Sequence, residues 1–528
     1  MDGTDLAAAP LESGPLLLLL CLLPLVGAAV VAAVPARAAE AAKRLAVAVA
    51  LATLAVAVVV ALRFDRGADA PYQLADRYDW IPQFGVSLSL GVTGISVALV
   101  ALTAVLVPLC LLASWDDGRA SSRRPQTHLA LMLALEGLIL AAFCARDVFL
   151  FYVCFEVMLI PMYFLIGGYG GAQRSYAAAK FLIYNLLGGL VMLAALIGLY
   201  VESRGLPGAE DGTFDITTLA TQLELGTTTE RLLFLGFFLA FAIKAPLWPL
   251  HTWLPDAAVE ARPGAAVLMV SVMDKLGTFG MIALCLPLFP AASVWARPVV
   301  VALAVVGIVY GALVAIGQSD LMRLIAYTSV SHFGFIIMGI FAMTSQGQTG
   351  ATLYMVNHGF STAGLFLIAG MMVTRRGSRL IADYGGVQRV APVLAGSFFV
   401  AGLSSLALPG LSSFVSEFLV LVGTFTRYQA AAVVATLGIV LAALYILLTV
   451  TRTLSGPVRP ETEGFRDLRG REAAVVAPVL AVIIALGFVP GPLIDVIDHG
   501  VDDTLASVSQ DDPAPSVPAA PVAEGSPE

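Results

Sequence analysis

Residues 231–252 read RLLFLGFFLAFAIKAPLWPLHT, an apolar run interrupted by one charge near its middle. The run is about as long as the roughly 20 residues that an α-helix needs to cross a bilayer. Its charge is Lys244, and Pro246 and Pro249 follow within five residues. Proline removes a backbone donor and breaks a helix, and broken backbone at membrane depth is tolerated only inside protein or beside a water-filled cavity. The stretch therefore predicts a broken membrane helix that carries a buried lysine.

The composition of the whole chain agrees with a membrane location. Of 528 residues, 59% are hydrophobic and 12% are charged, whereas a soluble domain carries about 25% charged residues. This composition excludes a large soluble enzyme, a nucleic-acid binder with a basic face and a disordered scaffold. The formal net charge of −8 says little about partners, because in membrane proteins the location of the charges matters more than their sum.

Apolar runs of spanning length recur along the chain and predict an all-α polytopic membrane protein with about fourteen transmembrane helices. The first run has an acidic leading segment and is too long for a signal peptide, so we interpret it as a helix. The runs lie at about residues 15–34, 44–62, 87–113, 127–144, 147–167, 176–201, 231–252, 264–288, 297–317, 325–343, 349–373, 391–425, 429–451 and 473–490.

The basic residues predict an orientation. With the N-terminus outside, 19 of the 29 Lys and Arg residues fall in inner loops and 8 in outer loops, as the positive-inside rule requires. An even number of helices then places both termini outside. Residues 503–528 are acidic and rich in Pro and Ala, which is typical of a disordered tail. The two cations that fall outside any loop are Lys244 and Lys275.

Six ionisable residues lie inside predicted spans, where a charge costs at least about 2.5–3.5 kcal/mol on insertion scales. One isolated pair could simply lock two helices together, but six such groups over several helices favour a functional site. We expect Glu156 to be the partner of Lys244, Lys275 to pass protons onward, and Glu417 to be a last station. The set is Glu136, Glu156, Lys244, Asp274, Lys275 and Glu417.

Three histidines extend this set. His251 follows Lys244 by seven residues, about two helical turns, so the two are expected to share a face. His332 and His358 lie on successive predicted helices beside Ser, Thr and Asn residues. A lone histidine in an apolar helix is usually a core residue, but two together among hydroxyl groups fit a hydrated proton relay.

A second break is predicted at Pro409, before Glu417. The two breaks occupy corresponding places in two sets of five helices, residues 127–290 and 291–452, and an odd number of helices per set inverts the second relative to the first. Paired interrupted segments of this kind indicate a transport site, although ordinary proline kinks are the alternative and no direct sequence identity joins the halves. Residues 1–126 hold the first three helices and residues 453–502 the last.

Cofactor signals do not appear in the sequence. It lacks a Gly-rich dinucleotide fingerprint and a phosphate-binding loop, and no spacing of His, Cys and carboxylates predicts a metal site. The cysteines form no C-x-x-C pair and are interpreted as buried apolar residues. They are Cys21, Cys110, Cys144, Cys154 and Cys285.

Four strings resemble a known family: FEVMLIPMYFLI (155–166), FAIKAPLWPLHTWLPD (241–256), RLIAYTSVSHFG (323–334) and NHGFSTAG (357–364). They are similar to the antiporter-like membrane subunits of respiratory complex I, most of all to the chain M branch in bacterial NADH–quinone oxidoreductases. The resemblance covers about residues 85–450. It implies a core of fourteen helices with two inverted five-helix repeats, in agreement with the pattern of apolar runs.

The resemblance also implies residue roles. Glu156 and Lys244 match a charged pair, Lys275 matches a central lysine, and Glu417 matches an acid where sister chains L and N carry lysine. Two departures are Thr93, where relatives commonly have an acid, and Asp274, which is unexpected beside Lys275. The remaining matches are the polar-axis histidines His332 and His358 and, with less weight, Glu136.

The function implied by the resemblance is proton translocation in the membrane arm of complex I. NADH, FMN, iron–sulfur clusters and quinone would then bind to other subunits, with none held by this chain. The implied partners are chains L and N and the lipid bilayer, without nucleic acid, in the bacterial plasma (inner) membrane. The alternatives are a subunit of a multi-subunit cation/proton antiporter, which shares the fold, and a structural membrane protein that bridges its neighbours.

Overall fold

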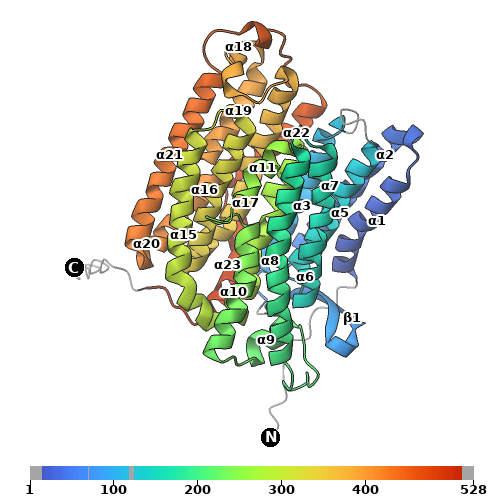
Figure 1. The fold of residues 1–528 in the computed structure, drawn as a ribbon, viewed down its shortest axis with the longest axis vertical. Coiled ribbons are helices and arrows are strands. Elements are labelled where there is room, and N and C mark those ends of the chain that lie inside the picture. The colour runs from blue at the N-terminus through green and yellow to red at the C-terminus, as the bar shows by residue number, and fades with distance from the viewer. Residues whose placement is uncertain (1–14, 69, 118–123, 514–528) are drawn as a thin grey trace, which may run out of the picture.

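The computed structural model describes residues 15–68, 70–117 and 124–513, which form a bundle of long helices (Figure 1). In these residues, twelve helical segments are long and apolar enough to cross a membrane. They are α1 (Leu16–Ala33), α2 (Ala39–Arg63), α3 (Gly94–Ala113), α5 (Pro125–Cys144), α6 with α7 (Val148–Val157 and Leu159–Tyr169), α8 (Arg174–Glu202), the composite span Pro263–Leu288, α15 (Pro290–Ile316), α16 (Leu321–Ala342), α17 (Ser345–Arg376), α21 (Gln429–Thr453) and α22 (Arg471–Phe488).

The two remaining predicted spans are the broken ones. The first consists of α10 (Thr227–Lys244) and α11 (Trp253–Glu260), and the second of α19 (Pro392–Ser405) and α20 (Ser412–Arg427). Pro246 and Pro249 lie in the first gap and Pro409 in the second, so both predicted breaks are confirmed. The helical membrane fold is confirmed as well, while the total of fourteen spans and the inverted repeat stay predictions.

The span Pro263–Leu288 is less regular than the sequence suggested. It begins as α12 (Pro263–Val267), continues through the π-helical segment η3 (Leu268–Met273), returns to α13 (Lys275–Gly280), and ends as a second π segment, η4 (Met281–Cys285), followed by α14 (Leu286–Leu288). π segments are rare and are frequent at functional sites. Asp274 and Lys275 lie at the junction between η3 and α13.

One β-hairpin departs from the all-α prediction. Strand β1 (Gln73–Ile81) pairs antiparallel with β2 (Val86–Val92), so the span predicted over 87–113 begins later, at Gly94. The period-two alternation of Ser and Leu in residues 86–90 explains the strand. Thr93 then caps α3, because its side chain accepts from the Ser96 amide at 3.2 Å while the Ser96 hydroxyl accepts from the Thr93 amide at 2.7 Å.

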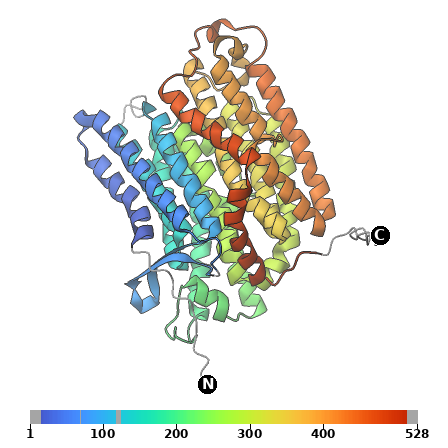
Figure 2. The same cartoon turned by 180° about the vertical axis from the view of Figure 1, so that it is seen from behind.

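The C-terminal segment is also more ordered than predicted. An amphipathic helix, α23 (Gly491–Ser507), follows α22, so the tail expected from residue 503 starts only after Ser507. The rest of the predicted tail from residue 514 lies outside the described residues. The hairpin, α9 and α23 gather at one end of the bundle and α18 at the other (Figures 1 and 2). The shorter elements are η1 (Ala36–Ala38), η2 (Pro82–Phe84), α9 (Ile216–Gln222), η5 (Ile381–Asp383), α18 (Val387–Val390) and η6 (Pro460–Thr462).

A loop carboxylate holds the start of the second broken helix. Asp467 accepts hydrogen bonds from the backbone amides of Val393 and Leu394, at 3.0 and 2.8 Å, in the first turn of α19. Burial raises the pKa of the Asp467 carboxyl, but these N–H donors outweigh it and hold that pKa below its ordinary value. The cap therefore satisfies helix donors that would otherwise have no partner.

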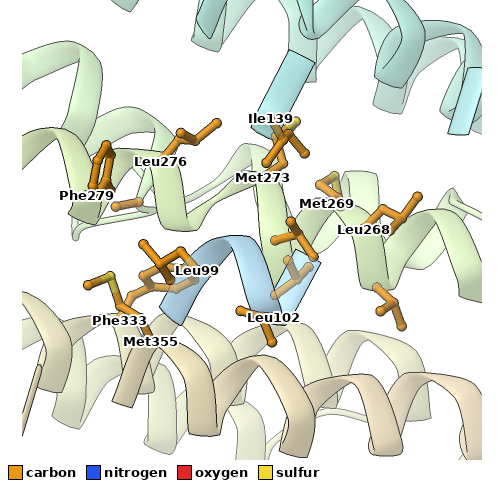
Figure 3. Close-up of a cluster of buried hydrophobic side chains, with 14 of the residues drawn as sticks. Leu99, Leu102, Ile139, Leu268, Met269, Met273, Leu276, Phe279, Phe333 and Met355 are labelled. Carbon is orange, nitrogen blue, oxygen red and sulfur yellow. The ribbon is translucent and has the colours of Figure 1, made fainter. Parts of the chain in front are cut away.

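The central helices are α16 and α17, which are buried along almost their whole length, whereas α2, α8, α21 and α22 present apolar side chains outward. Figure 3 shows the apolar packing around the irregular span, where Leu99 and Leu102 of α3 lie near Met269, Phe333 and Met355. Apolar side chains of this kind surround the charged residues described below. The outward apolar faces fit lipid or neighbouring subunits.

Close packing of α17 and α20 leads to the first prediction. A Cβ atom on Gly350 would lie 2.7 Å from the Val420 amide nitrogen and 2.8 Å from the Leu419 Cβ, so Gly350→Ala should push the two helices apart. We expect a loss of about 1–3 kcal/mol in stability, as for other overpacked sites, measured as earlier heat dissociation of the assembled complex on native gels. Gly396→Ala in α19 is the control, because no atom lies within 4 Å of its Cβ position. Equal stability of the two variants would contradict this account.

Candidate functional site

Four charged side chains from four separate elements form the centre of the site. Glu156 comes from α6, Lys244 ends α10, Lys275 begins α13, and Glu417 lies in α20. Both lysines are fully buried and Glu417 is nearly so, whereas Glu156 is partly exposed. The fold therefore places inside the helical bundle four of the charges that the sequence singled out.

Lys244 lies against Phe155. Its ammonium donates to the Phe155 carbonyl oxygen at 3.3 Å and stands 4.2 Å from the centre of the Phe155 ring, an arrangement that stabilises a cation in apolar surroundings. Glu156 is the next residue and interacts electrostatically with Lys244, although its Oε1 has no hydrogen-bond partner among the described residues. The structure thus brings the predicted pair together without locking it in a hydrogen bond.

Gly189 of α8 provides the space for the Glu156 carboxylate. A Cβ atom at Gly189 would collide with both carboxylate oxygens of Glu156. The position of this carboxylate relative to Lys244 therefore depends on a glycine in the neighbouring helix. Sequence reasoning missed Gly189, because only the packing of α6 on α8 shows its importance.

Lys275 has three close neighbours. Its Nζ lies 2.6 Å from His358 Nδ1 and donates to the Val270 carbonyl oxygen at 3.0 Å, and it stands 4.2 Å from the centre of the Phe333 ring. Since a protonated lysine only donates, Nδ1 of His358 accepts and the imidazole proton then sits on Nε2. Val270 belongs to η3, so the π segment supplies one of the acceptors that hold this buried cation.

Beyond His358 the contacts continue to Glu417. The ring centres of His332 and His358 are 5.3 Å apart, and Tyr354 lies 5.8 Å from His332 and 6.4 Å from His358. The Tyr354 hydroxyl donates to Glu417 Oε1 at 3.1 Å. Sequence reasoning missed Tyr354, which lies four residues before His358 and thus on the same helix face.

The second helix break is held in place by Asn357. Its side-chain amide donates to the Ser412 carbonyl oxygen at 2.7 Å and to the Ser416 hydroxyl at 3.2 Å. The break itself contains Gly410 with φ of +90°, a conformation that favours glycine. Asn357 thereby fixes the start of α20 and, with it, the position of Glu417 about one turn further along the helix.

Comparison with known proteins agrees with this geometry. A family model described as "NADH:quinone oxidoreductase/Mrp antiporter, TM" matches residues 145–442. The chain is 52% identical to NADH-quinone oxidoreductase subunit M of Mycobacterium tuberculosis, over 95% of this chain and 96% of that relative. The chain belongs to the NADH:quinone oxidoreductase/Mrp antiporter family.

Two solved structures are similar to this chain over most of its length. Respiratory complex I from Thermus thermophilus superposes with a TM-score of 0.84 at 31% identity, covering 93% of this chain and 99% of the matched chain. The Mrp complex from Dietzia has a TM-score of 0.80 at 23% identity, covering 94% and 99%, and shows the shared fold. The resemblance predicted from four short strings is thereby confirmed.

The prediction that His251 and Lys244 share one helix face is wrong. The chain between them is not a continuous helix, so a separation of seven residues no longer places both on one face. His251 instead packs against Tyr310 and Tyr327, with ring centres 5.1 and 6.3 Å away. Its role in a relay stays a prediction.

A charged cluster lies next to this histidine. Asp256 of α11 is bridged by Lys180 of α8 at 2.8 Å and by Arg323 of α16 at 2.9 Å. The cluster ties the second half of the broken helix to two neighbouring spans. Sequence reasoning missed this cluster, because it counted every Lys and Arg other than Lys244 and Lys275 as a loop residue.

Glu136 of α5 stands apart from these contacts. It is fully buried, and neither carboxylate oxygen has a hydrogen-bond partner among the described residues. Its supporting role also stays a prediction. Within the described part of the chain, no group of three or more His, Cys, Asp or Glu side chains is arranged to hold a metal ion.

Gly189 provides a test of the Glu156 position. We expect Gly189→Ala to displace the Glu156 carboxylate from Lys244 and to lower NADH-driven proton pumping about tenfold, the equivalent of about 1.4 kcal/mol. Pumping is measured with a pH-sensitive dye in sealed vesicles, relative to the amount of assembled complex. Gly198→Ala on the same helix is the control, because its Cβ would meet only the end of the flexible Leu233 side chain. Normal pumping by Gly189→Ala would show that the carboxylate position is unimportant.

Tyr354 provides a second test. Tyr354→Phe removes the hydroxyl that donates to Glu417 while keeping the ring that fills the core. The loss of one buried hydrogen bond, about 1–3 kcal/mol, should lower pumping about tenfold without loss of assembly. Pumping in vesicles and the yield of complex on native gels are compared in the same membranes. Tyr445→Phe is the matched control, since the Tyr445 hydroxyl is buried but has no hydrogen-bond partner among the described residues; equal effects would contradict a specific role for Tyr354.

Proposed function

We propose that this chain translocates protons through the membrane arm of NADH–quinone oxidoreductase, with Glu156, Lys244, Lys275 and Glu417 as the main stations. The main support for this proposal is a series of neighbouring side chains inside the bundle. It runs from Lys275 to Glu417 through His358, His332 and Tyr354. A structural ion pair would not need such a series. Glu136 and His251 are supporting members of the proposed relay.

Proton transfer along these stations follows from the contacts. Protonated Lys275 donates its proton to Nδ1 of His358, 2.6 Å away, which leaves a neutral amine and an imidazolium. The imidazolium then releases the proton from its other nitrogen toward His332 and Tyr354. Glu417 accepts from the Tyr354 hydroxyl and completes the series. Each donor is restored when the preceding station delivers the next proton.

The pairing of Glu156 with Lys244 suits the start of the series. A buried ammonium is stabilised by a nearby carboxylate and loses that stabilisation when the carboxylate moves or becomes neutral. Because Glu156 is held near Lys244 by packing on Gly189 and not by a hydrogen bond, a small displacement changes their attraction. Such a change would drive the proton of Lys244 onward.

The redox chemistry belongs to other subunits in this proposal. The chain would be a non-redox member of the complex, and NADH, FMN, iron–sulfur clusters and quinone would bind elsewhere. The support is its similarity over nearly its full length to relatives named subunit M. The alternative of a subunit in a cation/proton antiporter shares the fold, but the 52% identity favours the oxidoreductase.

The same reasoning proposes partners and location. Chains L and N are the proposed neighbours in a bacterial inner membrane, and the partly exposed Glu156 on α6 suits a surface that a neighbour covers. The excess of basic residues in one set of loops supports an outer location for both termini.

Lys244 provides the central test of this function. Lys244→Met keeps much of the side-chain volume but cannot carry a proton, so pumping should fall by about 100-fold, on the scale of a lost proton-transfer group. Turnover of NADH, dye-detected pumping in sealed vesicles and complex yield are measured together. Lys43→Met is the matched control, because Lys43 is also buried but lies on α2 and pairs with Glu40 at 3.1 Å. Full pumping by Lys244→Met would overturn the proposed relay.

A further inference from the structure

Asp274 is a buried carboxylate that the relay described above does not use. It is fully buried, and neither Oδ1 nor Oδ2 has a hydrogen-bond partner among the described residues. A charge buried without partners is costly, so such a group is rarely retained for packing alone. Its place at the junction between η3 and α13, directly before Lys275, puts it in the middle of the span that carries the central lysine.

Packing shows which way this part of α13 faces. Gly277 lies against the end of α10, where its Cβ position would be 2.6 Å from the Ala245 nitrogen and 2.7 Å from the Phe241 carbonyl oxygen. Asp274 precedes Gly277 by three residues and so lies on the same helix face. That face looks toward the turn of α10 that contains Lys244.

Both lysines interact with Asp274 through their charge. Lys244 and Lys275 each attract the Asp274 carboxylate. Their ammonium groups donate elsewhere, however: Lys244 to the Phe155 carbonyl, and Lys275 to the Val270 carbonyl beside His358. Asp274 is therefore attracted by both cations without the fixed geometry of a salt bridge.

The relay lacks a connection between Lys244 and Lys275, and Asp274 interacts with both of these residues. Charge attraction joins Glu156 to Lys244 at one end and contacts join Lys275 to Glu417 at the other, but no hydrogen bond in the described residues joins the two lysines. Lys275 accepts a proton only after it has given its own to His358, and without a hydrogen bond to Lys244 it has no direct donor in the described residues. A group that interacts with both lysines can accept a proton from Lys244 and give it to neutral Lys275.

We propose that Asp274 is this group and carries protons from Lys244 to Lys275. The inference rests on the proposed function, since it concerns the same relay. In the first step an N–H bond of the Lys244 ammonium breaks and an O–H bond forms on Asp274, which leaves a neutral amine and a neutral carboxylic acid. In the second step the acid O–H bond breaks and the proton forms a new N–H bond on neutral Lys275. The carboxylate is regenerated, and each transfer runs directly or through hydrogen-bonded water.

A purely structural role predicts different hydrogen bonds for Asp274. A structural carboxylate would be expected to accept hydrogen bonds from a lysine or from the backbone, as Asp467 does at the start of α19. Asp274 accepts none in the described residues. Free oxygens between two proton-bearing groups suit a carrier that must change partners.

Two substitutions test the carrier role in the assembled complex. Asp274→Asn keeps the shape but cannot carry a proton in this way, so pumping per unit of assembled complex should fall about 100-fold. Asp274→Glu restores a carboxyl group on a longer side chain and should keep clearly more pumping than Asp274→Asn. Pumping in sealed vesicles, NADH turnover and the yield on native gels are recorded for both, beside Lys244→Met.

The outcomes separate this inference from the proposed function. Loss in Asp274→Asn with recovery in Asp274→Glu, at normal assembly, supports the carrier role. Native pumping by Asp274→Asn overturns it, and so does an equal loss in both variants, which would make Asp274 a packing residue. If Lys244→Met fails to pump while Asp274→Asn pumps normally, only the carrier role fails; if Lys244→Met pumps normally, the proposed function fails.

Discussion

The cost of holding a positive charge at membrane depth is the constraint on which this structure depends. Each of the two central lysines is met by a backbone carbonyl and an aromatic ring, Phe155 for Lys244, and Val270 with the Phe333 ring for Lys275. Regular helices use their carbonyls internally, so such acceptors are most available where helices break or widen. The irregular backbone is therefore a requirement of the charges and not a defect of the bundle.

Close packing at glycines determines how near the charged elements lie to their neighbours. Gly189 leaves room for the Glu156 carboxylate, Gly277 lets α13 approach the end of α10, and Gly350 lets α17 approach α20. A side chain at any of these positions would force the atoms packed against it to move. The distances within the axis thus depend on residues that carry no charge.

Sequence reasoning predicted the features that depend on polarity and proline. It located the spans, the two breaks and the charged residues, because bilayer burial and the missing proline donor act locally on the chain. It missed the β-hairpin, whose alternating Ser and Leu were counted as part of an apolar span, and the π segments, whose hydrogen bonds depend on neighbouring helices. It also missed Tyr354, since an aromatic residue in an apolar helix is indistinguishable from core until its hydroxyl is seen to meet Glu417.

Asp274 and Lys275 are adjacent in the sequence, but their side chains face different neighbours. Consecutive residues on a helix point about 100° apart, so they serve different neighbours. Asp274 shares the face of Gly277, which packs on α10, while Lys275 reaches His358 of α17. Lys244 lies in the first predicted set of five helices, and Glu417 in the second. In the proposed relay, the turn of Asp274 and Lys275 connects these two ends, and π segments flank that turn on both sides.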